Sequence, residues 1–516
     1  MASSEKIISP GVFTNEIDQT FLPAAVGDIG AALVGPTVKG PPLVPTVVNS
    51  YSEFEQIFGS TFLSGSNSFS YLTSLTAREY LKNQGTLTVV RILDGNFTQA
   101  FANVQTGHSS SGYTGSTPLS VTGDSTAGAS AAGIGNILPH LHSSASTVSN
   151  PLSFRLNTIG YGEKFNTFPH RSTGVATDTA NLKLTGSANG LLLSGSDDSV
   201  RWEVTGTNAK KGTFNLLVRA GNDTHRQKQI LETWNNLSID PNANNYVAKV
   251  IGDSKPVLSS PGSEPYIAVS GSYPNKSKYV RVEVLKSVPD YLDVNGNISV
   301  SGSVEKSMPG NGSGSMGGAF TSGSSGYVGF DAFGNQQGGS GQVLLNENIS
   351  NTNTQGYKPN TASEGKTAYE DAISLLSNSD EYDINLLFLP GIIDNFATHQ
   401  PIVTKAINAC EDRADLFIVV DPTAWTDNPT SAQTRAEARN SNYAAMYYPW
   451  VQIGSSALGR PVWVPPSVAV LGAFSFNDAV AFPWFAPAGF ARGSISANAT
   501  AVRLNEDNID DLNDKR

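Results

Sequence analysis

The stretches Ile384-Asn-Leu-Leu-Phe-Leu389 and Leu416-Phe-Ile-Val-Val420 decide the fold. Each is a continuous apolar run of strand length, which indicates a strand buried on both faces. Between them a helix is predicted from about Thr398, with Pro401 in its first turn. Its apolar face consists of Ile402, Val403, Ala406, Ile407 and Cys410. Strand, helix and strand at this spacing form a βαβ unit, so the two strands are expected to be parallel.

A second α/β pattern lies near the N-terminus. Residues 31–34 and 87–92 indicate buried strands, and Ser50 or Ser52 is expected to cap a short helix that ends at Gly59. A longer helix is predicted from about Ser70 until Gly85 stops it. Its apolar face is expected to contain Phe69, Leu72, Thr76 and Tyr80. The two α/β patterns predict one split core domain, formed by 29–97 and 365–505, with a central, mostly parallel sheet.

The residues between these halves have a different character. Ser, Gly, Thr and Ala dominate 98–165, which is predicted to be a protruding insertion domain. Strand-like runs recur in 166–364, which is predicted to be a β-rich insertion domain. Residues 1–28 indicate an extended N-terminal arm, because Ser9-Pro10-Gly11 excludes a helix there. The predicted fold class is therefore α/β plus β, with β-rich domains inserted into a split α/β core.

Charge and cysteine content exclude several classes of protein. The 516 residues include 33 Lys plus Arg and 44 Asp plus Glu, and no basic tract, so a nucleic-acid partner is not expected. The single cysteine, Cys410, rules out an intrachain disulfide. The first ten residues lack the apolar core of a signal peptide. The protein is expected to be made in a cytoplasm and to leave it, if at all, by lysis.

The segment from Tyr443 to Gly493 is unusually apolar. Its 51 residues contain eleven aromatic side chains and three charges, and six prolines interrupt every window long enough to cross a bilayer. So much aromatic surface is not expected to lie in water. The segment is predicted to pack inside a domain, against a partner subunit, or both.

Two stretches resemble nucleotide-binding motifs but lack the residues or the structural context that these motifs need. Gly365-Lys366-Thr367 lacks the glycine five residues earlier that a phosphate-binding loop needs, because that position is Asn360. Lys366 is predicted to open a helix instead. The stretch Gly312-Ser-Gly-Ser-Met-Gly317 matches a dinucleotide-binding pattern only within a glycine-rich tract, with no strand before it.

The other reactive side chains do not combine into a site. Asp394 and Asp421 follow the two best strands, where open parallel sheets place ligands, yet turn or cap chemistry explains both. His399 is expected in the first turn of a helix, and His140 and His142 lack a third ligand nearby. Cys410 is expected to be a small core residue. No catalytic, cofactor-binding or metal-binding residue is predicted, and the protein is not expected to be an enzyme.

Three blocks in the apolar segment carry a resemblance. They are Tyr443-Ala-Ala-Met-Tyr-Tyr-Pro-Trp450, Val464-Pro-Pro-Ser-Val-Ala-Val-Leu-Gly472 and Ala486-Pro-Ala-Gly-Phe-Ala-Arg-Gly493. In this order they resemble consecutive signatures of the contractile tail sheath proteins of myophages, of the T4-like type. Leu231-Glu-Thr-Trp-Asn-Asn-Leu-Ser-Ile-Asp-Pro241 is similar to another signature of that family. The resemblance assigns structural roles to Pro449, Trp450, Pro465, Pro466, Pro487, Gly489, Arg492 and Gly493.

The resemblance implies a structural subunit of a bacteriophage tail sheath, assembled in the host cytoplasm and carried on the virion tail. Such subunits form stacked hexameric rings around the tail tube and contract to drive the tube through the host envelope. The tube protein, the baseplate and the tail terminator are the implied partners, with no cofactor and no insertion into the membrane. The implied linking arm consists of Ile7, Ile8, Pro10, Gly11, Val12 and Phe13.

One departure and three alternatives remain at this stage. Sheath proteins continue into a C-terminal domain, so 506–516 are interpreted as the start of a missing domain, and the chain alone is expected to remain monomeric. The first alternative is the sheath of a phage-tail-like contractile injection system. The second is an enzyme on a doubly wound α/β domain, with its site at Asp394 and Asp421. The third, a β-rich capsid or adhesin protein, does not account for the βαβ unit.

Overall fold

The computed structural model describes part of the chain, and all structural statements below concern that part. It covers residues 30–93, 99, 101–105, 152–161, 164–165, 199–220, 228–259, 265–285, 289–292, 309, 312–314, 329–330, 336–337 and 365–514, apart from 65–66, 84, 209, 426 and 482–484. The predictions made for residues 1–28 and for His140 and His142 lie outside these ranges.

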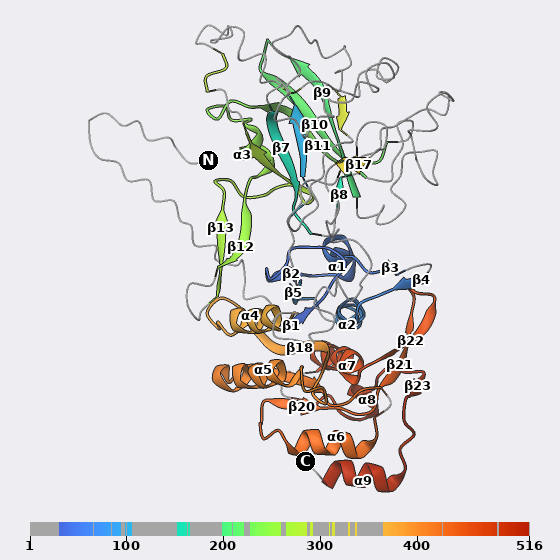
Figure 1. The fold of residues 1–516 in the computed structure, drawn as a ribbon. Helices are drawn as coiled ribbons and strands as arrows, with labels where there is room; N and C mark the ends of the chain where they lie inside the picture. The colour runs from blue at the N-terminus through green and yellow to red at the C-terminus, as the bar shows by residue number, and fades with distance from the viewer. Residues whose placement is uncertain are drawn as a thin grey trace, which may run out of the picture.

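A six-stranded sheet joins segments from both ends of the chain (Figure 1). Its strands are β1 (Gly30–Gly35), β2 (Thr46–Val48), β5 (Leu87–Arg91), β18 (Ile384–Ile393), β19 (Phe417–Asp421) and β20 (Ala444–Met446), in the order β2-β5-β1-β18-β19-β20. Strand β1 pairs in parallel with β5 on one side and with β18 on the other. Only β2 is antiparallel to its neighbour. The sheet is therefore mixed, and its centre is formed by strands about 350 residues apart.

Alternate residues of β1 face the two cores that cover this sheet. Ala31 and Leu33 belong to one core, with α1 (Tyr51–Phe58), α2 (Leu72–Tyr80) and α7 (Pro466–Val480). Ala32 and Val34 belong to the other, with α4 (Thr367–Leu376) and α5 (Gln400–Arg413). All four side chains are fully buried. The strand can be apolar on every residue because helices cover both faces of the sheet.

The predicted βαβ unit is confirmed. Strand β18, helix α5 and strand β19 follow one another, and β18 and β19 pair in parallel. Pro401 lies in the first turn of α5, and the five residues of its predicted apolar face are all buried. The helix ends at Ala414, which adopts a left-handed conformation.

The N-terminal prediction was wrong in one detail. Phe69 does not lie on the helix that follows, because it ends β4 (Asn67–Phe69), which pairs with β3 (Phe62–Ser64). Tyr71 has an extended backbone and is the N-cap of α2, so the helix starts only at Leu72. An apolar residue directly before a helix has the same spacing as one inside it, which is why the pattern misplaced Phe69.

Ser50, not Ser52, caps α1. The Ser50 side chain accepts a hydrogen bond of 3.1 Å from the Glu53 amide, and the Glu53 carboxylate accepts one from Asn49 N–H. We expect Ser50→Ala to lower the free energy of unfolding by about 1 kcal/mol, because the cap is lost. Ser52→Ala is the matched control, since Ser52 is an exposed residue within the same helix. Urea unfolding of the two variants tests this, and equal losses would contradict the assignment of the cap.

Several smaller sheets form the rest of the structure. One contains β8 (Lys164–Phe165), β9 (Ser199–Asn208), β10 (Thr213–Ala220), β11 (Ile230–Ser238) and β15 (Gly312–Gly314). Another contains β6 (Phe101–Gln105), β7 (Leu152–Thr158) and β14 (Val280–Val284). Two-stranded pairs are β12 (Lys255–Ser259) with β13 (Tyr266–Ser270), and β16 (Gly329–Phe330) with β17 (Gln336–Gln337). A separate core around Trp202 and Phe214 includes α3 (Val247–Ile251).

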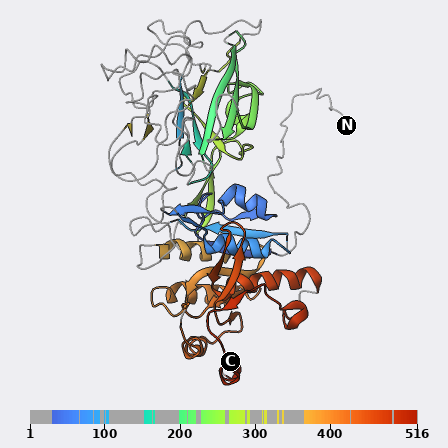
Figure 2. The same ribbon diagram turned by 90° about the vertical axis from the view of Figure 1, so that its right-hand side faces the viewer.

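These sheets lie above the six-stranded sheet in both views, whereas α6 (Pro429–Glu437) and α9 (Glu506–Asp514) lie below it (Figure 1 and Figure 2). Arg91, at the end of β5, is fully buried at the junction. Its guanidinium donates to the carbonyl oxygens of Gly40 and Tyr161, and also to that of Val38. This side chain therefore connects the central sheet to the segment that follows β7. The domain boundaries themselves stay a prediction.

Residues 429–514 complete the part of the structure that lies around and below the six-stranded sheet. They contain α6 (Pro429–Glu437), α8 (Gly489–Arg492), α9 (Glu506–Asp514) and a three-stranded sheet of β21 (Val451–Ser455), β22 (Arg460–Val464) and β23 (Ala499–Thr500). None of the helices in the described ranges has the length and apolar character needed to cross a membrane. The whole is a mixed α/β structure with one mixed sheet and several separate small ones.

Candidate functional site

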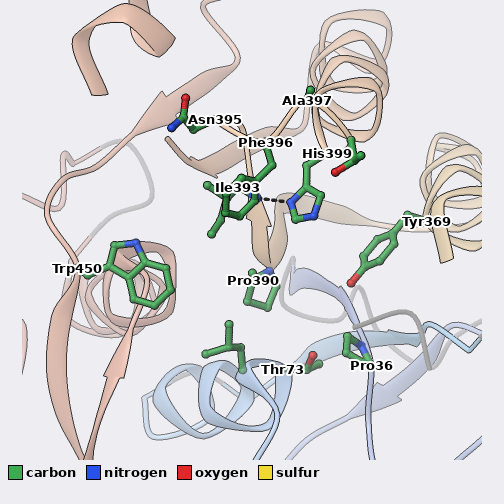
Figure 3. A pocket seen from close by; sticks show the side chains of 13 residues that line it. Pro36, Thr73, Tyr369, Pro390, Ile393, Asn395, Phe396, Ala397, His399 and Trp450 are labelled. Carbon is green, nitrogen blue, oxygen red and sulfur yellow. Dashed lines mark hydrogen bonds between the residues drawn. The ribbon is translucent and has the colours of Figure 1, made fainter. Parts of the chain in front are cut away.

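A cavity of about 510 Å³ lies at the carboxyl ends of β1 and β18 (Figure 3). After β1 the chain continues to β5 on one side of the sheet, and after β18 it continues to β19 on the other. Such a reversal of strand order opens a crevice in which α/β proteins commonly bind ligands. The cavity is lined by Pro36, Leu72, Thr73, Tyr369, Pro390, Gly391, Ile393, Asn395, Phe396, Ala397, Thr398, His399 and Trp450.

His399 is held in one protonation state by its surroundings. Its Nδ1 accepts a 2.9 Å hydrogen bond from the Ile393 amide, and its ring packs edge-on against Phe396, with 5.2 Å between the ring centroids. The residue is only 7% exposed, and burial lowers the pKa of His399 to about 4. The imidazole is therefore neutral near pH 7, with its proton on Nε2. No residue that the structure describes accepts a hydrogen bond from this Nε2–H.

Thr73 and Trp450 contribute from segments almost 400 residues apart. Thr73 is fully buried in the first turn of α2, and its hydroxyl has no hydrogen-bond partner within the described ranges. The Trp450 indole N–H donates to the Thr423 carbonyl at 2.8 Å, which fixes the ring at one wall of the cavity. In Figure 3 the hydroxyls of Thr73 and Tyr369 and the imidazole of His399 point toward the space around Pro390. The cavity thus combines aromatic walls with uncharged hydrogen-bonding groups.

Asp394, which follows β18, is fully buried and ion-paired. Its Oδ2 accepts from Arg435 Nε at 2.8 Å, and its Oδ1 accepts from Arg439 Nη2. Arg439 also donates to Thr404 in α5 at 2.8 Å. The carboxylate therefore connects β18, α5 and α6. The partners of Asp394 are thus two arginines, and not the turn or cap that the sequence suggested.

Asp421, at the end of β19, is also buried, with 1% exposure. Its Oδ1 accepts from the Ser467 amide at 3.1 Å, and its Oδ2 lies 2.7 Å from the Ser467 hydroxyl. Burial raises the pKa of Asp421 to about 7, although hydrogen bonds from Ser467 and from the Gly391 backbone lower it. The carboxyl group connects β19 to the first turn of α7. It serves a helix 46 residues downstream and not its own turn.

The structure brings the two strand-end aspartates together without forming a reaction centre. The Asp394 amide donates to the Asp421 carbonyl at 2.9 Å, yet the two carboxyl groups bind different partners. Neither carboxylate lines the cavity. Across the described ranges, no three His, Cys, Asp or Glu side chains gather as metal ligands would. The sequence analysis named Trp450 only for a structural role and did not name Thr73 as a site residue, because a search at strand ends finds only residues that directly follow a strand.

The remaining sequence candidates are distributed elsewhere. Lys366 directly precedes α4, as predicted, and pairs with Glu370 at 3.3 Å. Gly312 to Gly314 form β15, and residues 315–317 lie outside the described ranges.

Cys410 is fully buried on α5, and burial raises the pKa of its thiol to about 12. Because the thiolate is the reactive form, we expect the folded protein to react with a disulfide reagent at least about a thousandfold more slowly than the unfolded protein. The measurement is simple because the chain has one cysteine. One thiol should appear in guanidinium chloride and none in buffer. Rapid reaction of the native protein would show that α5 is not packed as described.

The residues singled out by the resemblance take recognisable structural positions. Pro465 is the N-cap of α7 and Pro466 its first residue, while Pro449 follows a cis peptide bond. Gly489 has φ of 74°, where glycine is favoured, and begins α8. Arg492 ends α8 and lies over the Phe485 ring, 4.8 Å from its centroid. These positions do not test their role in the family, which stays a prediction.

The apolar segment 443–493 is partly interior and partly exposed. Val451, Ile453, Val464, Val468 and Leu471 are buried, so the segment does build a core. Further along, large apolar side chains face outward around α7 and α8: Phe476 at 37%, Val480 at 56%, Phe485 at 43% and Phe490 at 104% exposure. The buried side chains are aliphatic, whereas the described aromatic side chains of the segment are half-buried or exposed, so the predicted burial of its aromatic surface is not seen within this chain. These four side chains are called the α7–α8 face below.

Solved structures that are similar to this chain include two sheath tail proteins. A sheath tail protein from Listeria innocua has a TM-score of 0.41 at 9% identity, covering 94% of this chain and 64% of that one. A sheath tail protein from Desulfitobacterium hafniense has a TM-score of 0.36 at 10% identity, covering 98% of this chain and 70% of that one. This chain thus spans 64% of the length of the Listeria protein. No protein-family model and no curated protein matches the sequence. Because both TM-scores lie below 0.5, the function proposed next rests on sequence and geometry.

Proposed function

We propose that the protein is a structural subunit of the contractile tail sheath of a bacteriophage. The observation that carries the proposal is the order of three sequence blocks, 443–450, 464–472 and 486–493, which resemble consecutive sheath signatures. In this proposal the subunit polymerises around the tail tube, and contraction drives the tube through the host envelope.

The α7–α8 face supports an assembly role. Four large apolar side chains lie exposed within about 15 residues, and Phe490 has no cover at all. Large apolar side chains exposed at neighbouring positions of the chain favour a protein–protein contact, because leaving them in water is unfavourable. We therefore assign the α7–α8 face to a contact with a neighbouring subunit in the sheath.

The strand-end carboxylates also favour a structural role over an enzymatic one. A general base or nucleophile needs a carboxylate that can reach a substrate. Asp394 is occupied by two arginines, and Asp421 is occupied by Ser467. Asp394 holds β18, α5 and α6 together, and Asp421 holds β19 and α7 together. Such links suit a subunit that must transmit force.

The finer parts of the proposal follow from the resemblance. They are the T4-like type, the hexameric rings and the partners: the tube protein, the baseplate and the tail terminator. Residues 7–13 are proposed to link neighbouring subunits by adding a strand to another subunit's sheet. Contraction would be a change between two packings of the same subunit, which requires no cofactor. The virion tail is the proposed location.

Electron microscopy tests the proposal. Protein expressed from its complete reading frame should form hollow, striated tubes, and antibodies to this chain should label contractile tails along their length. Discrete particles at every concentration, together with unlabelled tails, would refute it. Phe490→Asp should reduce tube formation without altering the melting temperature, because the side chain is fully exposed. Val269→Asp, at another exposed apolar position on β13, is the matched control.

A further inference from the structure

We propose that the cavity at the ends of β1 and β18 binds a small uncharged aromatic molecule that carries a carbonyl group, such as an aromatic amide. Nothing in the sheath function requires such a site, so the inference is independent of the proposed function. It rests on the size of the cavity, on its walls, and on the Nε2–H group of His399, which has no acceptor among the described residues.

The first step concerns size and position. At about 510 Å³ the cavity is within the range of pockets that enclose small organic ligands. Its floor is made of buried residues, including Pro36, Thr73 and Pro390, whereas its rim at 395–398 is exposed. A ligand can therefore enter from solvent past the rim and still be largely enclosed.

The second step concerns the free donor. Since Nδ1 of His399 accepts from the Ile393 amide, Nε2 carries the proton and can only donate. His399 is more than nine-tenths buried, and Figure 3 shows its ring turned toward the cavity. The Nε2–H group is therefore available to an acceptor on a ligand. A ligand carbonyl would supply that acceptor.

The third step concerns Thr73. Thr73 lies at the floor of the cavity, opposite His399 across Pro390 (Figure 3). Its hydroxyl oxygen has no accessible surface and packs against Gly35. A ligand in the cavity therefore meets Thr73 as part of the wall, and His399 is the group that selects an acceptor.

The fourth step concerns charge and shape. None of the thirteen lining residues carries a charge once His399 is neutral. A carboxylate or an ammonium group would lose its hydration without gaining an ion pair there. Phe396 and Trp450 provide aromatic surfaces, which pack favourably against a ring. These features favour an uncharged aromatic amide over an aromatic acid.

Benzamide is the probe, with benzoate as its charged counterpart, and binding is measured by calorimetry and by ligand-observed NMR. Benzamide should bind the full chain at least about tenfold more tightly than benzoate. Thr73→Val keeps the shape of the floor and removes a hydroxyl that a ligand cannot reach, so it should leave benzamide binding unchanged. Ala397→Trp places an indole at the exposed rim and should abolish binding. Ala438→Trp, on an exposed site at the end of α6, should leave binding unchanged.

Two results would overturn the inference. One is the absence of benzamide binding to the unaltered protein at millimolar concentration. The other is binding that persists equally in Ala397→Trp, which would place the molecule outside this cavity.

Discussion

Replacing Asp394 by alanine is expected to lower the free energy of unfolding by about 3–5 kcal/mol. The side chain is fully buried and is paired with Arg435 and Arg439, which are 16% and 18% exposed. Removing the carboxylate leaves two largely buried guanidinium groups without their counter-charge. The loss therefore exceeds that of an exposed ion pair, which typically contributes under about 1 kcal/mol.

A triple variant separates the cost of unpaired charge from the value of the network itself. Asp394→Leu combined with Arg435→Met and Arg439→Met removes all three charges at similar volume, and should recover much of the lost stability. Urea unfolding of the single and triple variants measures the free energy lost with Asp394 alone and the free energy recovered when all three charges are removed. If Asp394→Ala costs less than about 1 kcal/mol, the arginines are solvated and the network does not hold α6 in place.

The sequence predicts those features of the fold that depend on neighbouring residues. The βαβ unit could be predicted because each of its three elements has its own hydrophobic pattern. These elements are Ile384–Leu389, the apolar face of α5, and Leu416–Val420. The N-cap of α1 was predicted to be one of two serines, because an N-cap needs a side-chain oxygen at the residue directly before the helix. The choice between Ser50 and Ser52 required the backbone, since only one of them has extended geometry before the helix.

Features that join distant segments could not be predicted. The arginine partners of Asp394 lie 41 and 45 residues away, and nothing in the local pattern connects them. The cavity combines Thr73 from α2 with His399 and Trp450, so its existence depends on β1 lying beside β18. Local periodicity gives the elements but not the order in which strands pair. The two strand-end aspartates were found, but their partners decide that they are structural.

Asp421 is expected to make the protein less stable as the pH rises from about 5 to about 8. Burial raises the pKa of its carboxyl group from 3.8 to about 7 in the folded protein. The folded state therefore keeps the proton over a range in which the unfolded state has released it. A raised folded-state pKa contributes stability that is fully present below the unfolded pKa and is lost as the pH passes the folded pKa. The gap between the two pKa values corresponds to about 4 kcal/mol, of which about 3 kcal/mol falls between pH 5 and pH 8.

The variant Asp421→Asn isolates this contribution, because an amide resembles the protonated acid and does not titrate. Its Oδ1 can accept from the Ser467 amide, and its N–H can donate to the Ser467 hydroxyl, so the link between β19 and α7 is kept. The stability of the unaltered protein relative to this variant should fall by about 3 kcal/mol between pH 5 and pH 8 in urea unfolding.

Asp415→Asn is the control. Its hydrogen bond to Arg413 lowers the pKa of Asp415, so it should contribute no slope in this range. A constant difference between the unaltered protein and Asp421→Asn would mean that Asp421 is already ionised at pH 5. Hydrogen bonds from Ser467 and Gly391 would then outweigh the desolvation of the buried carboxylate.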